Sequence, residues 1–260
     1  MSERGARSRA EIDTIHLSAL NAGTTSARTL AEALAIDYRV LLQTVLPDAD
    51  EELRTIVAEA QQLGILKRMT RIGAALADHL DVAEVERLAG HTSDTVRGWV
   101  CFLHASRATT DPAALLDQLR SFADDEHFAV REWVWMAARP TLISDLDTSI
   151  DLLAGWTGDP SERVRRFASE ALRPRGVWAA HIPALKEQPE LGEPILHPLH
   201  TDTSSYVQDS VANWINDAAK TRPDWAIELC ERWTAESDTA ATARIVKRAL
   251  RSVDHTSALP

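Results

Sequence analysis

A repeat of 34 residues constrains this chain more than any other feature of its sequence. The dipeptide Val-Arg recurs at that interval, at 96–97, 130–131 and 164–165. The dipeptide Arg-Pro recurs at the same interval, at 139–140 and 173–174, so the register holds across a whole unit. A fourth copy, Val207-Gln208, follows after 43 residues, and the extra length is assigned to 175–189. Self-similarity at this period is typical of stacked helical pairs that share a continuous core.

Each repeat carries a serine, an aspartate or both at fixed positions before its valine. A serine stands three residues before it at 93, 161 and 204, and an aspartate stands five residues before it at 125, 159 and 202. Both residue types favour turns and helix N-caps, so each unit is predicted to be a helix, a turn and a second helix. The expected fold is all-α, a right-handed α-solenoid of HEAT-like helical repeats. We expect a single domain over 1–260, with N-terminal helices at 1–91 and groove-lining repeats at 92–260.

The charge of the chain argues against a general nucleic-acid binder. Its 260 residues carry a formal net charge of −11, whereas nucleic-acid-binding domains are usually basic. The basic residues are gathered locally, however. Residues 160–175 hold five arginines and two acids, and residues 239–251 hold four basic residues and no acid. A local basic face of this kind still allows phosphate binding, with a strong dependence on salt.

Cysteine usage and hydropathy predict a cytoplasmic protein. The chain has two cysteines and no secretory leader, which indicates a reducing compartment without a disulfide framework. No apolar run is long enough to cross a membrane, so no membrane contact is expected. Two pairs of metal-ligating residue types stand at i, i+3, Cys101 with His104 and His197 with His200, but neither has further ligands at suitable spacing. We therefore predict no metal and no cofactor.

The stretch from Ser161 to Trp178 combines a helix with an unusually placed acid. Ser161 is a suitable N-cap, an apolar stripe at helical spacing follows it, and Pro174 cannot continue the helix. Glu170 then lies near the end of that helix, where the macrodipole disfavours a negative charge. A local rule broken without evident compensation marks a candidate functional residue.

Three carboxylates occupy related positions in successive repeats. Counted from the valine, Glu132 stands at +2, Glu170 at +6 and Asp217 at +10. Because four residues turn a helix by only about 40° beyond a full rotation, these offsets lie on one helix face, and the three acids are predicted to line one groove. Acids on solvated helix faces are the simpler interpretation. The +3 position holds Trp99 and Trp133, and Phe167 in the third repeat, so these residues are predicted to be core.

Several motifs resemble those of a known family. The segment VRRFASEALRPRGVW at 164–178 resembles the signature of the AlkC branch of the AlkC/AlkD (HEAT-like repeat) bacterial DNA alkylation repair glycosylases. The segments at 20–23, 30–38, 96–99 and 205–220 also resemble that family, in the same order along the chain. Three departures stand out: Gly176-Val177 precede Trp178 and Ala171 follows Glu170, where the family has other residues, and Trp214 lies where the family has a less bulky one. They bear on the choice of substrate.

The resemblance implies a monofunctional hydrolase that excises cationic N-alkylated bases, of the 3-methyladenine type, from DNA. It raises Glu170, Asp217 and Glu132 to catalytic candidates and places Trp178 against the lesion. The implied partner is double-stranded DNA containing alkylated bases, bound by a monomer without a cofactor. The candidates for phosphate contact are the basic residues near these acids: Arg163, Arg165, Arg166, Arg173, Arg175, Lys220 and Lys247.

A non-catalytic function is the alternative that the sequence leaves open. A HEAT-type scaffold could bind DNA or protein without chemistry, since carboxylates in the groove of an acidic protein suit a basic peptide equally well.

Overall fold

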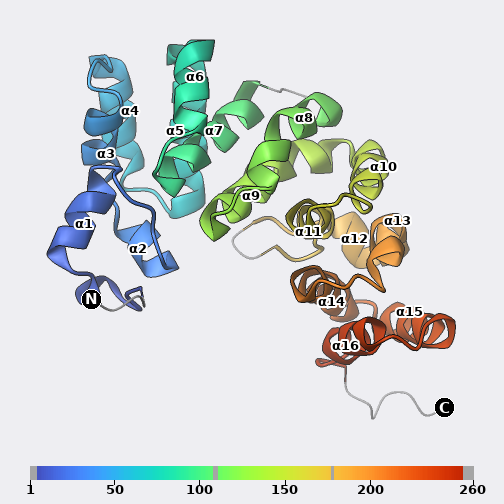
Figure 1. Cartoon of the computed structure of the whole chain (residues 1–260). Helices are drawn as coiled ribbons and strands as arrows, with labels where there is room; N and C mark the ends of the chain where they lie inside the picture. The colour runs from blue at the N-terminus through green and yellow to red at the C-terminus, as the bar shows by residue number, and fades with distance from the viewer. Residues whose placement is uncertain (1–4, 108–110, 177–178, 254–260) are drawn as a thin grey trace. The chain divides into compact units, whose positions relative to one another are not determined.

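The computed structural model describes residues 5–107, 111–176 and 179–253, and every regular element in them is helical (Figure 1). This confirms the all-α prediction. Contacts divide the chain into two compact units, Met1–Ala138 and Arg139–Pro260. The expectation of a single domain stays a prediction.

The first unit contains the N-terminal helices and the first repeats. Its elements are η1 (Arg9–Glu11), α1 (Thr14–Asn21), α2 (Leu30–Ala35), α3 (Tyr38–Val45), α4 (Glu51–Ala60), α5 (Ile65–His79), α6 (Val82–Ala89), α7 (Asp94–Arg107), α8 (Pro112–Ala123) and most of α9 (Phe128–Ser144).

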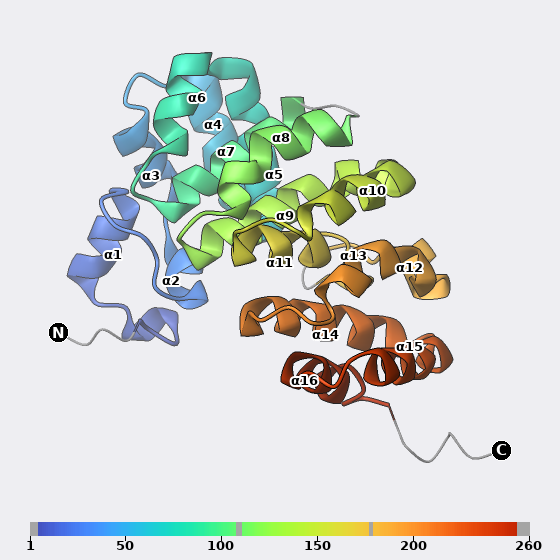
Figure 2. The same cartoon turned by 45° about the vertical axis from the view of Figure 1, so that its right-hand side comes forward.

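Helix boundaries in the first unit follow local sequence chemistry. Gly23, with φ of 71°, terminates α1 in the left-handed region that glycine tolerates best, as its position after Asn21 predicts. Asp50 and Asp81 cap α4 and α6 through hydrogen bonds to backbone N–H groups. In the middle of the unit α5 packs on both α4 and α7, and all three helices are labelled in Figure 2.

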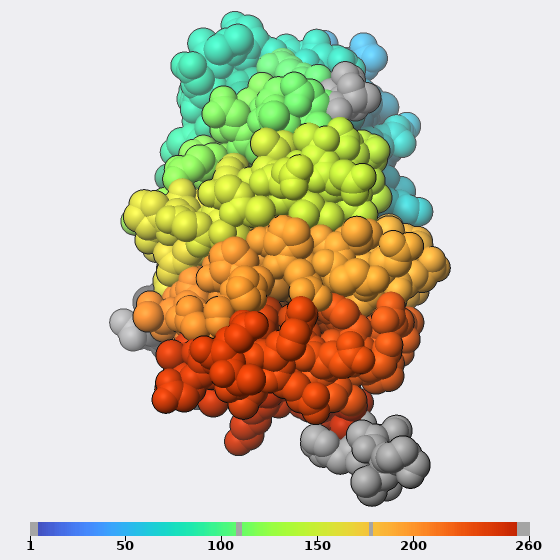
Figure 3. Space-filling model, turned by 90° about the vertical axis from the view of Figure 1, so that its right-hand side faces the viewer, coloured from blue at the N-terminus to red at the C-terminus, as the bar shows by residue number. Residues whose placement is uncertain are grey.

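The second unit holds the remaining repeats. After the end of α9 come α10 (Leu146–Trp156), α11 (Glu162–Glu170), α12 (Pro183–Glu187), η2 (Pro189–Gly192), α13 (Glu193–Leu196), η3 (His197–Leu199), α14 (Ser205–Ala219), α15 (Pro223–Glu236) and α16 (Ala240–Ala249). The second helices of the repeats form one layer, because α14 packs against both α11 and α16. In Figure 3 the yellow, orange and red bands of this unit follow one another in chain order. No helix in the described ranges combines the length and the apolar character that a membrane crossing requires.

The repeated valines and aromatic residues form the core, as predicted. Val96, Val130, Val164 and Val207 are fully buried. The aromatic residues at +3, Trp99, Trp133 and Phe167, are also buried, and so is Cys101. Apolar side chains at equivalent positions thus supply the hydrophobic contacts within each unit.

The repeated arginine joins one repeat to the next through hydrogen bonds and an ion pair, an arrangement called here a structural tie. In the first unit, Arg97 Nη1 donates to the carbonyl oxygens of His91 and Thr92, at 2.6 and 3.0 Å, in the loop before its own helix. Its Nε and Nη2 donate to the two carboxylate oxygens of Asp125, 2.9 and 3.2 Å away, in the loop of the next repeat. One guanidinium therefore satisfies two loop carbonyls and one carboxylate.

Arg165 repeats this arrangement in the second unit. It donates to the carbonyl oxygens of Asp159 and Pro160, at 2.8 and 3.1 Å, and to both oxygens of Asp202, at 2.6 and 3.1 Å. The Asp202 side chain is 5% exposed and also accepts from the Ser204 backbone N–H. The arginine and aspartate positions of the sequence repeat thus correspond to the two ends of one buried ion pair.

We expect Asp202→Ala to destabilise the second unit. The substitution leaves the half-buried guanidinium of Arg165 without its carboxylate, and the free energy of unfolding should fall by about 2–4 kcal/mol in urea denaturation. Asp224→Ala is the matched control, because the side chains of Asp224 and its partner Arg222 are 60% and 34% exposed and solvent screens their ion pair. Equal losses in the two variants would contradict a structural tie.

Candidate active site

Glu170 and Asp217 meet at one guanidinium in the second unit. Glu170 is the last residue of α11, and Asp217 lies on α14, which packs against it. Arg173, just after α11, donates from Nη1 to Glu170 Oε1 at 2.8 Å and from Nη2 to Asp217 Oδ2 at 2.6 Å. Its Nε also donates to Asp217 Oδ2, at 3.0 Å. Both acidic residues are 5% exposed, so two predicted catalytic candidates form one buried cluster with a predicted phosphate-binding residue.

The partners of Glu170 compensate for its position at the end of a helix. Ser210 donates its hydroxyl to Glu170 Oε2 at 2.6 Å, and Arg166 Nη2 lies 3.6 Å from the same oxygen. Burial by itself raises the pKa of this carboxyl, but the positive charges of Arg166 and Arg173 and the Ser210 hydrogen bond outweigh it. The pKa of Glu170 therefore lies below its ordinary value, and the group is ionised at neutral pH.

Asp217 is bound by cations on both of its oxygens. Oδ2 faces Arg173, and Oδ1 accepts from Lys220 Nζ at 2.9 Å. The Lys220 side chain is 46% exposed, so this edge of the cluster reaches the protein surface. The backbone carbonyl of Asp217 accepts from Arg175 Nε at 3.0 Å. The end of α14 is thus joined to the segment after α11 through Arg173 and Arg175.

Arg139 lies beside this cluster and was not among the site residues predicted from the sequence. It is 2% exposed and donates to the carbonyl oxygens of Ala171, Arg173 and Ala180, at 2.8, 2.6 and 3.0 Å. Burial and the charge of Arg173 lower the pKa of Arg139 to about 10, so the guanidinium stays charged at neutral pH. It fixes the backbone that carries Arg173. The Arg-Pro repeat was the available signal, since Arg139 stands 34 residues before Arg173.

Two nearby residues fix the end of α11 further. Pro174 follows α11, which ends at Glu170. The equivalent proline of the preceding repeat, Pro140, instead lies inside α9. Trp214, a departure from the family pattern, is buried, and its Nε1 donates to the carbonyl oxygen of Leu172 at 3.1 Å. The proline predicted an end near Arg173, and the helix ends three residues earlier, at Glu170. An indole from α14 binds the backbone just after that end.

The other predicted phosphate contacts differ in their surroundings. Arg165 is committed to Asp202, as described above. Arg166 stacks over the Tyr206 ring, with its Cζ 4.6 Å from the ring centroid, and Arg163 is half-buried in the first turn of α11. Lys247 is exposed on α16. The role of all these residues in DNA binding stays a prediction.

The basic stretch on α16 is partly neutralised by an acid of α14. Arg244 Nη2 and Arg248 Nε lie 2.7 and 2.9 Å from Asp209 Oδ1. Arg251 Nη2 donates to Asn213 Oδ1 at 2.9 Å. The second helices of adjacent repeats thus bring several cations to the surface near the carboxylate cluster.

Glu132 and Trp178 are the remaining sequence candidates. Glu132 belongs to the first unit, where its Oε2 accepts from Trp135 Nε1 at 2.8 Å. Its expected place beside Glu170 and Asp217 stays a prediction. Trp178 lies outside the described residues.

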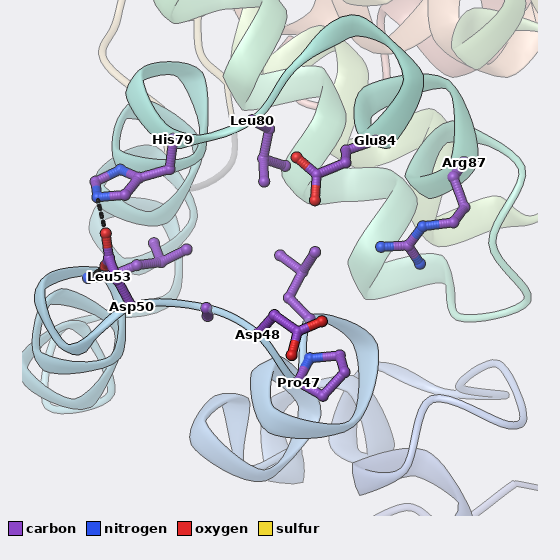
Figure 4. Close-up of a pocket in the computed structure, with 10 residues that line it drawn as sticks. Pro47, Asp48, Asp50, Leu53, His79, Leu80, Glu84 and Arg87 are labelled. Atoms are coloured by element: carbon purple, nitrogen blue, oxygen red, sulfur yellow. Dashed lines mark hydrogen bonds and ion pairs between the residues drawn. The ribbon is translucent and has the colours of Figure 1, made fainter.

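A separate cavity of about 210 Å³ lies in the first unit between the α3–α4 and α5–α6 connections (Figure 4). Asp48, Asp50, His79, Glu84 and Arg87 supply its polar lining, and His79 Nε2 lies 3.5 Å from Asp50 Oδ2. None of the predicted site residues lines this cavity. Within the described parts of the chain, no group of three or more His, Cys, Asp or Glu side chains is arranged to hold a metal ion.

Comparison with known proteins identifies relatives in sequence and in fold. No family model matches the chain. The uncharacterized protein YhaZ of Bacillus subtilis (strain 168) is 41% identical over 117 residues, which are 45% of this chain and 32% of that protein. The alkylpurine DNA glycosylase AlkC of Pseudomonas fluorescens, solved bound to DNA containing an abasic site analog, matches with a TM-score of 0.69 and 27% identity.

The match to AlkC covers 95% of this chain and 65% of that one, so the chain spans less than two thirds of either relative. AlkD2 from Streptococcus mutans matches with a TM-score of 0.61 and 20% identity, over 78% of this chain and 99% of that one. The protein smu.31 from Streptococcus mutans UA159 matches with a TM-score of 0.60 and 21% identity, over 78% of this chain and 100% of that one. These matches agree with the resemblance of the motifs at 164–178 and 205–220, and the chain is similar in fold to AlkC and AlkD2.

Proposed function

We propose that this protein is a DNA glycosylase that removes cationic N-alkylated bases, of the 3-methyladenine type, by hydrolysing the N-glycosidic bond. The observation that carries the proposal is the pair of buried carboxylates, Glu170 and Asp217, held by Arg173 on adjacent repeats. The similarity to AlkC, which was solved with DNA containing an abasic site analog, supports the same reaction class.

The chemistry requires stabilisation of positive charge rather than a strong nucleophile. An alkylated purine carries a formal positive charge, so the electron pair of the breaking C1′–N bond leaves with the base and neutralises it. The sugar becomes an oxocarbenium-like cation, as in glycoside hydrolysis. A water oxygen then bonds to C1′ and loses its proton to a carboxylate, which leaves an abasic site and a neutral base.

Glu170 and Asp217 would supply the negative potential in this scheme. The low pKa of Glu170, held down by Arg166, Arg173 and Ser210 against the effect of burial, keeps its charge available at neutral pH. Preorganised charges in a site shielded from water stabilise a developing opposite charge more than they would in solution. Arg139 supports them indirectly by fixing the backbone of Arg173.

DNA would be held through its phosphates by the cations around this cluster. Lys220 is exposed at the end of α14, and Lys247 is exposed on α16. Phosphate contacts of this type position a duplex without selecting its sequence. Local positive charge also accounts for phosphate binding by a chain whose net charge is −11.

A binding scaffold without catalysis is the second candidate, and one observation favours it. Both oxygens of Glu170 and both oxygens of Asp217 already have partners within the chain. A fully satisfied network of this kind suits a purely structural role.

Charge-removing substitutions separate the two candidates. We expect Glu170→Gln and Asp217→Asn to slow release of 3-methyladenine from alkylated duplex by roughly 10²- to 10³-fold, because each removes one preorganised charge. Duplex affinity should be unchanged or higher, since a negative charge near phosphate is lost. Single-turnover release and duplex binding measure the two effects separately.

Asp209→Asn is the matched control, because Asp209 lies on α14 in a more exposed ion pair with Arg244. It should release base at close to the wild-type rate. Wild-type rates in both Glu170→Gln and Asp217→Asn would rule out this site, and a wild-type protein that binds duplex without releasing base would establish the scaffold function.

The pH dependence of the reaction should reflect the lowered pKa of Glu170. The carboxylate stays ionised through the range in which an ordinary glutamate becomes protonated, so the rate should hold there and fall only as the pH drops through the lower native value. Base release corrected for spontaneous loss, with folding monitored by circular dichroism, measures this acid limb. A rate that halves near the ordinary glutamate pKa in a folded protein would argue against Glu170.

Salt dependence tests the phosphate contacts. The double variant Lys220→Ala/Lys247→Ala should weaken binding equally on all sequences and reduce the slope of log affinity against log salt by up to about two. Arg232→Ala is the control, because Arg232 is exposed on α15 and pairs with Glu193. If the slope falls in Arg232→Ala but not in the double variant, DNA binds the side of the unit that carries α15 and not the layer of α14 and α16.

A further inference from the structure

Ser210 occupies a position where the other repeats place an aromatic core residue. Counted from each repeated valine, +3 holds Trp99, Trp133 and Phe167, all buried, and then Ser210. Ser210 is itself 2% exposed, so the exchange is not a surface substitution. A serine here gives up a large apolar contribution to the core. The presence of serine in place of an aromatic core residue indicates that the hydroxyl group has a specific function.

The hydroxyl of Ser210 is directed at the carboxylate of Glu170. The distance from its Oγ to Glu170 Oε2 is 2.6 Å, which is typical of a charge-assisted O–H···O hydrogen bond. Ser210 and Asp217 are two helical turns apart on α14, so this helix offers a hydroxyl to Glu170 and a carboxylate to Arg173.

A second buried hydroxyl supports the first. Ser169 Oγ lies 2.8 Å from Ser210 Oγ and 3.1 Å from the carbonyl oxygen of Arg166, and its one proton is directed at the nearer acceptor, Ser210. Ser169 is fully buried beside Glu170 on α11. The two serines form a chain from Ser169 to Ser210 to Glu170 that crosses between the two helices. Consecutive hydrogen bonds polarise one another, which strengthens the final bond to the carboxylate.

The two carboxylates of the cluster therefore differ in the partners of their outer oxygens. Asp217 Oδ1 is bound by the ammonium group of Lys220, which is partly exposed. Glu170 Oε2 accepts a hydrogen bond from a neutral, buried hydroxyl, and Arg166 Nη2 lies 3.6 Å from the same oxygen. A hydroxyl fixes the direction of a carboxylate without cancelling its charge.

We propose that Ser210, supported by Ser169, is a positioning residue that holds the Glu170 carboxylate ionised and in one orientation for the reaction. This inference rests on the proposed glycosylase function. It assigns the buried hydroxyl chain a part in the reaction, in place of the aromatic core packing found in the equivalent repeats.

The test is the pH dependence of the rate of base release in Ser210→Ala, and in particular the acid limb, where the rate falls as the pH is lowered. Because the lost hydroxyl lowers the pKa of Glu170 in the native protein, its removal should shift the limb to higher pH. The plateau rate at neutral pH should fall roughly 10-fold, since one hydrogen bond to a charged group is lost. Ser169→Ala should shift the limb in the same direction by a smaller amount, because Ser169 acts through Ser210.

Ser149→Ala is the matched control. Ser149 is fully buried on α10 in the same unit, and its hydroxyl has no hydrogen-bond partner among the described residues. In this variant we expect the acid limb of the pH–rate profile and the plateau rate at neutral pH to match those of the wild-type protein. If Ser210→Ala keeps the wild-type limb while Glu170→Gln is inactive, the inference is overturned and the proposed function stands.

Unfolding free energy measured against pH tests the same contact without activity. Glu170 stabilises the native state above its unfolded pKa, and this stability is lost as the pH falls through the lower native value. In Ser210→Ala the native pKa lies closer to the unfolded one, so the loss should be complete at higher pH and smaller in total. A uniform destabilisation that leaves the shape of the curve unchanged would show that Ser210 only packs, whereas failure of Glu170→Gln to slow the reaction would count against the function itself.

Discussion

Arginine side chains that satisfy loop carbonyls are the interaction on which this structure depends. The junctions between helical pairs contain backbone oxygens that the helices leave unpaired, and a buried acceptor without a donor is costly. Arg97 and Arg165 supply donors to these junctions and bind a carboxylate of the next repeat. Arg139 and Arg173 apply the same chemistry near the carboxylate cluster, where one fixes a backbone and the other joins two acids.

The sequence predicted the fold through its period and the acids through their offsets. The repeated valines and aromatic residues are core, and Glu170 and Asp217 lie together because their helices pack side by side. The side chains between them were harder to predict. Arg165 and Arg173 were expected at phosphate, but a list of basic residues does not show which guanidinium groups bind internal carboxylates.

The contacts that were missed join residues far apart in the sequence. Arg139 reaches the carbonyl of Ala180, 41 residues away, and Ser210 reaches Glu170, 40 residues away. Neither contact follows from helical periodicity, because each depends on how two elements pack. The sequence did contain one usable sign, the serine at an aromatic position of the repeat, and its meaning becomes clear only with the carboxylate beside it.

The ion pairs Arg97–Asp125 and Arg165–Asp202 differ in how far apart their partners lie in the sequence. Arg97 and Asp125 are 28 residues apart in the sequence, whereas Arg165 and Asp202 are 37 apart, yet both pairs close with the same bidentate geometry. The additional residues are accommodated between the tie points, in the segment that contains α12 and η2. The connecting segment between two repeats of this chain can therefore differ in length and composition while the ion pair that sets their stacking register stays the same.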